Sequence, residues 1–503
     1  MTELQQISQT VIQWAALTFI SLLGIGVLIV IIVYIIDKRQ TSQTIRRNYP
    51  VIGRFRYFFE HMGEFFRQYF FAMDREEMPF NRAERNWAYR AAKKMDTTIA
   101  FGSTRSLDIE GDAIFLNSPF PTLDEDAVAA EPLTIGEESC VKPYTTNSII
   151  NISGMSFGAI SKPAVQALSK GAKKAGIWMN TGEGGLSPYH LEGGCDIVFQ
   201  IGTAKYGVRD EKGELCDQKL KQMAAHEQVR MFEIKMSQGA KPGKGGILPG
   251  IKVTAEIAKI RGIPEGHDSI SPNGHLDISS VSDLLDMIER VRKVTGKPVG
   301  FKMVVGQIDF FHDLFTEIHN RGIKSAPDFI TLDSADGGTG AAPQPLMDYV
   351  GMPLKQSLPL VVNLLHEYGL KKRIIVIASG KLITPGKVAW ALAMGADFIT
   401  SARGFMFSLG CIQALQCNKN TCPTGITTHK ADLQRGLVPE DKAERVANFA
   451  TKMIYGVGLI AHSCGVSQPR GLDRSHVRII HHGGHSEPLI EVHPIPKVKE
   501  QYL

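Results

Sequence analysis

Charge is absent from most of the N-terminal stretch, since no Asp, Glu, Lys or Arg occurs between Leu4 and Ile36. Within it, Val11–Ile36 consists mostly of Ile, Leu, Val, Ala and Phe. About 20 such residues in a helix are enough to cross the hydrocarbon core of a bilayer. A secretory signal peptide would begin with basic residues and end at a small-residue cleavage site, whereas only Glu3 precedes this run and Asp37 follows it. The sequence therefore predicts an uncleaved, single-pass transmembrane helix.

Acidic side chains are also missing from the next segment, between Lys38 and Phe59. Six basic side chains lie there: Lys38, Arg39, Arg46, Arg47, Arg54 and Arg56. The formal charge of +5 comes from 56 Lys and Arg against 51 Asp and Glu, so without these six the balance is 50 against 51. Such a cluster stays in the cytoplasm and favours anionic headgroups. We expect everything after Lys38 to be cytoplasmic, and we expect no nucleic-acid partner.

The segment Tyr57–Phe71 (YFFEHMGEFFRQYFF) is aromatic and amphipathic. Helices of this kind lie at membrane interfaces, but the same pattern also serves for packing against a folded domain. The sequence leaves both alternatives open.

Two structural signatures are lacking in the rest of the chain. Seven cysteines in 503 residues need not form a disulfide framework, because a chain of this size can bury a sufficient core and the cytoplasm is reducing. The dinucleotide fingerprint GxGxxG is absent, since Ser153–Gly158 (SGMSFG) has the wrong glycine spacing. This spacing argues against an open, doubly wound sheet.

From about Asn147 onward, short β-rich runs alternate with longer helical patterns. Strands are expected at 148–153, 177–181, 197–201, 231–236, 298–304, 328–332, 373–378 and 397–401, with helices such as 162–175, 217–229, 283–294 and 384–394 between them. Several of the runs are apolar throughout, as strands buried on both faces should be. Eight β/α units predict an α/β fold, a TIM (β/α)8 barrel preceded by the transmembrane helix.

The expected layout has four parts. Residues 1–37 form the transmembrane anchor and residues 38–130 a basic juxtamembrane and helical region. Residues 131–430 form the barrel with a cysteine-containing loop, and residues 431–503 form a C-terminal helical extension and tail.

In such a barrel, ligands bind at the carboxyl ends of the strands. Six of the eight expected strand ends combine glycine with a polar or charged residue, at 153–161, 180–185, 234–246, 333–343, 378–381 and 401–404. Glycine lets the backbone approach a ligand and supplies N–H donors. The seventh and eighth ends carry Ser379-Gly380-Lys381 and Ala402-Arg403-Gly404. These are the positions at which TIM barrels commonly bind phosphate.

The second and fourth strand ends bring charged side chains to the same opening. Lys235 and Lys241 follow the fourth strand, and Glu183 follows the second. Two cations over a cavity suit an anionic substrate such as a carboxylate, although ordinary ion pairing is the alternative.

Three cysteines are grouped just past the last strand, as Cys411-x5-Cys417-x4-Cys422-Pro423. Thiolates bind iron–sulfur clusters, but this spacing matches neither the bacterial ferredoxin run nor a CxxC zinc ribbon. Three ligands suit a three-iron cluster, or a four-iron cluster with an outside ligand. The spacing of the cysteines alone favours neither an iron–sulfur cluster nor a set of buried structural thiols.

Taken together, these motifs resemble the FMN-binding domain of glutamate synthase in a stand-alone, membrane-anchored form. The resemblance runs from about Glu131 to about Lys430. It is carried by MSFGAIS (155–161), NTGEGG (180–185), IKMSQGAKPG (234–243), ISP (270–272), DGGTGAAP (336–343) and GCIQALQCNKNTCPTG (410–425). That family holds a [3Fe-4S] cluster with the same cysteine spacing and has a TIM-barrel fold.

The resemblance implies an enzyme, a glutamate synthase-like oxidoreductase acting on CH-NH2 donors. Reduced FMN would pass a hydride to 2-iminoglutarate, formed from 2-oxoglutarate or a similar keto acid and ammonia, and a ferredoxin-like or other donor would supply electrons through the cluster. The implied catalytic and substrate residues are Glu183, Lys235, Gln238, Lys241 and Arg261. The implied FMN ligands are Gly154, Met155, Ser156, Phe157, Asn180, Thr181, Lys235, Gly337, Gly338, Ser379, Gly380, Lys381 and Arg403. The implied cluster ligands are Cys411, Cys417 and Cys422.

The chain departs from the family pattern at several points. Where members usually read GEGGQLPG, this chain has Lys244 in place of Glu and Ile247 in place of Gln. These changes leave open a flavin enzyme acting on another amino, keto or hydroxy acid, such as an N-methylglutamate synthase-like enzyme. A membrane-tethered electron-transfer module is a further alternative. No N-terminal cysteine-nucleophile domain precedes the barrel, so ammonia is expected to be free or to come from a separate amidotransferase chain.

Overall fold

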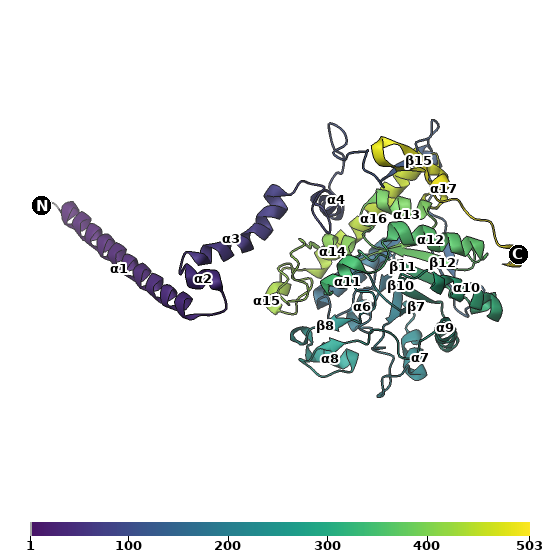
Figure 1. Ribbon diagram of the computed structural model, residues 1–503, viewed down its shortest axis with the longest axis horizontal. Helices are drawn as coiled ribbons and strands as arrows, with labels where there is room; N and C mark the ends of the chain where they lie inside the picture. The colour runs from purple at the N-terminus through teal and green to yellow at the C-terminus, as the bar shows by residue number, and fades with distance from the viewer. Residues whose placement is uncertain (1–2, 503) are drawn as a thin grey trace. The chain divides into compact units, whose positions relative to one another are not determined.

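The computed structural model describes residues 3–502, which fold as two units, Met1–Arg82 and Ala83–Leu503 (Figure 1). The first unit contains α1 (Glu3–Arg39), α2 (Thr44–Asn48) and α3 (Gly53–Phe66), and the chain continues from α3 as the single π-helical turn η1 (Arg67–Phe71). Helix α1 is long and apolar enough over Gln6–Arg39 to cross a membrane, judged by length and composition.

The second unit contains a closed barrel of eight parallel strands. In chain order they are β4 (Ile150–Ile152), β5 (Met179–Asn180), β6 (Ile197–Ile201), β7 (Val229–Lys235), β10 (Val299–Val304), β11 (Phe329–Asp333), β12 (Ile375–Ser379) and β13 (Phe398–Ser401). The last strand closes on the first, with Thr400 opposite Asn151. The predicted barrel is confirmed, and each expected strand overlaps one of these eight.

Helices cover the barrel between its strands. The main ones are α5 (Lys162–Ala175), α7 (Asp217–Ala225), α9 (Val281–Thr295), α10 (Asp309–Arg321), α12 (Leu354–Glu367) and α13 (Pro385–Ala393). Helix α5 has clear local signals at both ends, because the Ser161 side chain accepts a hydrogen bond from the N–H of Ala164 and Gly176 follows at a φ of 67°. Its interior Gly171 is needed for close packing, since a Cβ there would lie 2.5 Å from Val446.

Shorter elements and the C-terminal region complete the unit. The remaining helices are α4 (Arg82–Ala92), α6 (Pro188–Glu192), α8 (Ala255–Arg261), α11 (Gln344–Tyr349), α14 (Arg403–Leu409), α15 (Ala431–Gln434), α16 (Pro439–Ser463) and α17 (Leu489–Val492). Helix α16 packs against α5, α13 and α14. Outside the barrel, β1 (Ala113–Phe115), β14 (Val477–Ile480) and β15 (Ser486–Pro488) form an antiparallel sheet, and β8 (Ile247–Leu248) pairs with β9 (Ser269–Ile270).

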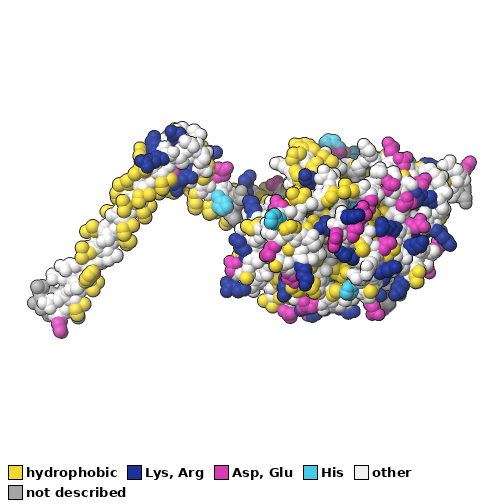
Figure 2. All heavy atoms as spheres, turned by 90° about the horizontal axis from the view of Figure 1, so that it is seen from below, with side chains coloured by type: hydrophobic (Ala, Val, Ile, Leu, Met, Phe, Trp, Pro, Cys, Tyr) yellow, Lys and Arg dark blue, Asp and Glu magenta, His cyan; other side chains and the backbone are white. Residues whose placement is uncertain are grey.

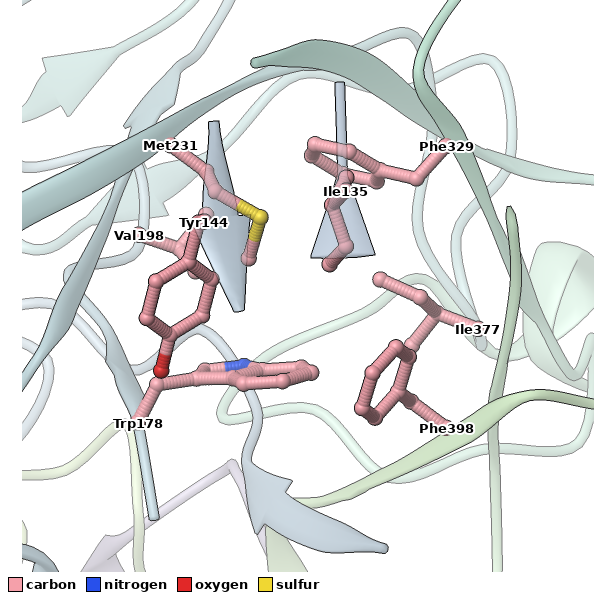
Figure 3. Packing of buried hydrophobic residues seen from close by; sticks show 8 residues of the cluster. All are labelled: Ile135, Tyr144, Trp178, Val198, Met231, Phe329, Ile377 and Phe398. Atoms are coloured by element: carbon pink, nitrogen blue, oxygen red, sulfur yellow. The ribbon is translucent and has the colours of Figure 1, made fainter. Parts of the chain in front are cut away.

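A hairpin of β2 (Leu133–Ile135) and β3 (Tyr144–Thr146) packs against the amino-terminal ends of the barrel strands. Its Ile135 and Tyr144 lie among buried side chains contributed by five barrel strands and by Trp178, just before β5 (Figure 3). The members of this cluster are Ile135, Tyr144, Trp178, Val198, Met231, Phe329, Ile377 and Phe398. Because this end is filled with apolar side chains, the opposite end of the barrel is the one available to a ligand.

Candidate active site

A cavity of about 1390 Å³, counted out to its open mouth, lies at the carboxyl ends of the barrel strands. All eight strands contribute to its wall, at or near Ser153, Gly182, Gln200, Lys235, Lys302, Asp333, Ser379 and Ser401. Most of the residues that the sequence indicates for the site line it: Gly154, Met155, Ser156, Glu183, Lys235, Gln238, Lys241, Arg261, Gly337, Gly338, Ser379, Gly380, Lys381, Arg403 and Cys417. The fold therefore brings together segments that lie far apart in the chain.

The wall of this cavity is strongly biased toward positive charge. Its cationic residues are Lys235, Lys241, Lys252, Arg261, Lys302, Lys381 and Arg403, against two carboxylates, Glu183 and Asp333. A concave, partly desolvated surface with such an excess attracts anions and binds them through charge-assisted hydrogen bonds. The site is therefore suited to one or more ligands that carry several negative charges.

An ion pair lies at the centre of the cluster on β7. The Lys235 Nζ is 2.9 Å from a carboxylate oxygen of Glu183 and also donates to Gln238 Oε1. The Gln238 amide donates in turn to Thr339 Oγ1 at 3.0 Å. Lys235 is the last residue of β7, so the strand fixes its backbone while the neighbouring loops fix the direction of its side chain.

The charges in this cluster shift one another's pKa values. Burial raises the pKa of Glu183, but the neighbouring cations, with Lys235 first among them, outweigh burial and hold its pKa below the ordinary value of 4.5. Burial and then the charge of Lys235 lower the pKa of Lys241 to about 8. Glu183 is thus an acceptor at neutral pH, and the Lys241 ammonium can release its proton close to physiological pH.

Arg261 reaches the cavity from the end of α8. Its guanidinium is buried and donates to Ser269 Oγ, Ser156 Oγ and the carbonyl of Phe157 at 3.1–3.3 Å. Its Nε has no hydrogen-bond partner among residues 3–502. A buried guanidinium with an unused N–H is costly unless a ligand accepts from it. The Arg261 Nε–H is therefore available to an anionic or carbonyl oxygen of a ligand.

The opposite side of the wall is built by the ends of β11, β12 and β13. Lys381 forms an ion pair with Asp336 at 3.0 Å, and Arg403 donates to the carbonyl of Thr339. The Arg403 side chain packs closely over Gly338, since a Cβ there would lie 2.6 Å from Arg403 Nε. A Cβ on Gly340 would instead meet nothing within 4 Å.

This part of the site fits a phosphate-bearing flavin such as FMN. The cations Lys381 and Arg403 follow the seventh and eighth strands, where a TIM barrel commonly binds phosphate. The open space beside Gly340, which lines the cavity, allows a flat ring system to approach the backbone. The donor set and the shape of the wall are thus compatible with this cofactor.

Three residues that the sequence indicates for the flavin site do not line the cavity: Phe157, Asn180 and Thr181. They lie behind its wall. The Phe157 ring packs edge-on against Tyr189, and the Asn180 amide donates to a carboxylate oxygen of Glu233 at 2.7 Å. The Thr181 hydroxyl accepts from the N–H of Gln200. Asn180 supports the wall from the barrel interior, whereas Phe157 packs against helix α6 outside the strands.

Several residues of the site are missing from the sequence-based expectations. Glu233 lies inside the barrel and accepts hydrogen bonds from Asn180, Gln200 and Thr331 at 2.6–2.7 Å. Lys302 and Asp333 form an ion pair at 3.1 Å on the cavity wall. A charged residue within an otherwise apolar buried strand was the available signal, as in VGFKMV (299–304).

The cysteine motif forms one loop after α14. Cys411, Cys417 and Cys422 are free thiols. Burial raises the pKa of Cys411, the charge of Arg403 opposes this rise, and the charges of Cys417 and Cys422 add to it. Hydrogen bonds from Thr424 and Thr427 outweigh burial and lower the pKa of Cys422. Among the described residues, no three His, Cys, Asp or Glu side chains are placed to hold a single metal ion.

An iron–sulfur cluster needs a wider arrangement of ligands than a single metal ion does, because each thiolate binds its own iron. The loop winds tightly between its cysteines, with Gln413, Leu415 and Asn420 all in the left-handed region at φ of 55–58°. Arg403 Nη1 lies 4.0 Å from Cys417 Sγ and also lines the cavity. The donor chemistry fits a cluster adjacent to the flavin side of the site.

The chain is similar in sequence to several known proteins. Residues 113–467 match the family model described as the conserved region in glutamate synthase. The glutamate synthase large subunit-like protein YerD of Bacillus subtilis (strain 168) is 40% identical over 496 residues, which cover 91% of this chain and 94% of that protein. The archaeal glutamate synthase [NADPH] of Methanocaldococcus jannaschii is 35% identical over 334 residues, 64% of this chain and 60% of that protein.

The chain thus spans about 60% of the length of the archaeal relative. A solved structure of an active (S)-mandelate dehydrogenase chimera has a TM-score of 0.46 at 13% sequence identity. The match covers 73% of this chain and 87% of the solved chain, and the structural likeness is weak. The family model covers most of the chain, including every barrel strand and the cysteine loop. The chain therefore belongs to the glutamate synthase family.

Proposed function

We propose that the chain is an FMN-dependent, iron–sulfur oxidoreductase that reductively aminates a keto diacid, with 2-oxoglutarate and ammonia giving L-glutamate. The observation that carries the proposal is the cation-rich cavity in which Lys235, Lys241 and Arg261 surround Glu183. A substrate with two carboxylates needs this number of cations. Membership of the glutamate synthase family supports the reaction class.

The cofactors are assigned to opposite sides of one wall. The segment Gly154–Ser156, the glycines 337 and 338, the segment Ser379–Lys381 and Arg403 would hold FMN, and Cys411, Cys417 and Cys422 would hold the cluster. When bound, FMN would supply two-electron redox chemistry, and the cluster would relay single electrons from a ferredoxin-like or other donor.

The protein's own residues would bind the substrate and manage protons. The Lys235 ammonium, held by Glu183, and the unused Nε–H of Arg261 would bind carboxylate oxygens. Lys241, with its pKa lowered to about 8, would donate a proton from Nζ to the oxygen that leaves as water when the imine forms. Gln238 would keep the Lys235 side chain in place through its hydrogen bond.

A second candidate substrate is favoured by Ile247, which lines the cavity. An apolar side chain at this point accommodates a less polar group, so methylamine in place of ammonia would give an N-methylglutamate synthase-like reaction. The Ile247→Gln variant would shift preference back toward ammonia, and that shift separates the two candidates.

The site is assigned to the cytoplasm, with α1 as the membrane anchor. Support comes from the apolar span Gln6–Arg39 and from the basic residues at its carboxyl end. Ammonia would be free or would be supplied by a separate amidotransferase chain.

The test uses the full chain purified in detergent with its flavin reduced. Keto acids are then added one at a time with ammonia or methylamine, and flavin reoxidation is followed by absorbance. Reoxidation by 2-oxoglutarate with ammonia, and its loss in Lys235→Met, is the expected result. If no keto acid reoxidises the flavin with either amine, the proposal is wrong.

A further inference from the structure

Helix α3 and the π-helical turn η1 carry an aromatic stripe that the barrel site does not use. Large apolar side chains recur at helical spacing along one face: Phe55, Phe58, Phe59, Met62, Phe66, Tyr69 and Phe70. Phe59 is 64% exposed and Phe70 is 73% exposed. In a water-soluble fold, the apolar stripe of a helix packs against a hydrophobic core. Because this stripe is exposed, we expect it to contact an apolar partner.

A buried carboxylate ties the start of this helix to the end of α1. Asp37 has no exposed surface and accepts hydrogen bonds from the guanidinium groups of Arg46 and Arg54 at 2.8–3.1 Å. Its other oxygen accepts from the N–H of Val51 at 3.0 Å. Both guanidinium groups remain partly exposed, so the network is enclosed at the carboxylate and open at the arginines. The first residues of α3 are therefore held where the apolar run of α1 ends.

Close backbone packing reinforces this connection. A Cβ on Gly53, the first residue of α3, would lie 2.9 Å from the carbonyl oxygen of Ile45 in α2. Figure 1 shows α3 turning away from the line of α1 after α2. The two helices thus share one corner instead of packing along their lengths.

Positive charge gathers at the same corner. Asp37 is already paired with two arginines, and the nearby Lys38, Arg39, Arg47 and Arg56 have exposed side chains. Figure 2 shows Lys and Arg side chains grouped at the bend of this unit, beside hydrophobic side chains that run along it. Each cation near an anionic bilayer surface adds to the attraction.

We propose that α3 and η1 form an interface helix, which lies on the cytoplasmic surface of an anionic bilayer with the aromatic stripe in the acyl boundary. The proposal rests on the proposed span of α1, because that span places Asp37 at headgroup depth. Aromatic side chains favour this depth, and the basic corner matches anionic headgroups in charge. The bilayer, and no protein surface, is the partner of the stripe.

Site-specific photocrosslinking in the full chain tests this. Benzoylphenylalanine is placed at Phe58 or Phe70 on the stripe, at Glu60 on the other face as a matched control, and at Ile20 in α1. The chain is reconstituted in nanodiscs of phosphatidylcholine with or without phosphatidylserine. Positions 58 and 70 should give lipid adducts several-fold more often than position 60, and removal of phosphatidylserine should lower their yield without changing that of position 20.

Other outcomes overturn the proposal in distinguishable ways. Adducts from 58 and 70 to peptides of residues 83–502 would show that the barrel unit covers the stripe, and adducts to a second copy would show a dimer contact. Equal lipid adducts at 58, 60 and 70 would show that the helix has no preferred face. If position 20 gives no lipid adduct, the span of α1 itself is wrong, whereas adducts at 20 alone refute only the interface helix.

Discussion

Replacing Lys241 should stabilise the protein while it removes activity. Lys241 is 4% exposed, and its pKa falls from 10.5 in a free side chain to about 8 in the folded chain. Between these pH values the unfolded chain holds a proton that the folded chain has released, so stability rises with pH across this window. Below pH 8 both states are protonated, and the charged lysine costs the folded state about 3 kcal/mol.

The Lys241→Met variant removes this cost and keeps most of the side-chain volume. At about 2.1 cal/mol/K per residue, a unit of about 420 residues has an unfolding entropy near 0.9 kcal/mol/K. The apparent Tm at pH 7 should therefore rise by about 4 °C. At pH 10 the remaining difference of about 1 kcal/mol corresponds to about 1 °C. Calorimetry of the substrate-free chain in detergent at both pH values measures the two shifts.

Lys244→Met is the matched control, because Lys244 belongs to the same loop and is exposed. Its Tm should change by less than about 1 °C at both pH values. Flavin reoxidation by keto acid and ammonia should fall about 100-fold or more in Lys241→Met, as expected for the loss of a general acid. A stabilisation that does not depend on pH, or a destabilised Lys241→Met at pH 7, would refute the reasoning.

Two further predictions concern the barrel interior and the cysteine loop. Glu233→Leu leaves the donors of Asn180, Gln200 and Thr331 without their acceptor, so the free energy of unfolding should fall by about 3–5 kcal/mol by calorimetry, whereas Glu233→Gln, which keeps an acceptor oxygen, should lose less. An equal loss in both variants would contradict the role given to the hydrogen bonds. Cys417→Ser should lower the iron content by colorimetric assay and slow flavin reduction by a one-electron donor while FMN stays bound. Loss of FMN as well would indicate that the loop is structural.

The sequence located the barrel elements because parallel strands buried on both faces are apolar along their whole length. Strand β6 has the predicted bounds, Ile197–Ile201, and α5 has the predicted bounds, Lys162–Ala175. In the structure, Ser161 caps the start of α5 and Gly176 ends it. Strand β5 is shorter than the predicted 177–181, and only Met179–Asn180 pair as a strand.

Side-chain direction at the strand ends was harder to predict than position. Asn180 ends β5, and its amide points to Glu233 in the barrel interior. Strand alternation fixes two possible directions, and which one faces the ligand depends on the closure of the barrel. The ion pair of Lys302 and Asp333 depends on the register of β10 and β11, in which Lys302 lies opposite Thr331, two residues before Asp333. The lysine within the apolar strand 299–304 signals a buried charge, but nothing in the local sequence identifies its partner.

The pairing of β1 with β14 has a consequence for how the chain is made. Ile114 lies opposite Arg478, so strand β1 has no partner until almost the whole chain has left the ribosome. At about 5–20 residues per second, that wait is about 20–70 s. The proposed anchor α1 emerges long before this pairing is complete. Biosynthesis would therefore leave β1 without its partner strand while the whole barrel, whose last strand ends at Ser401, is being made.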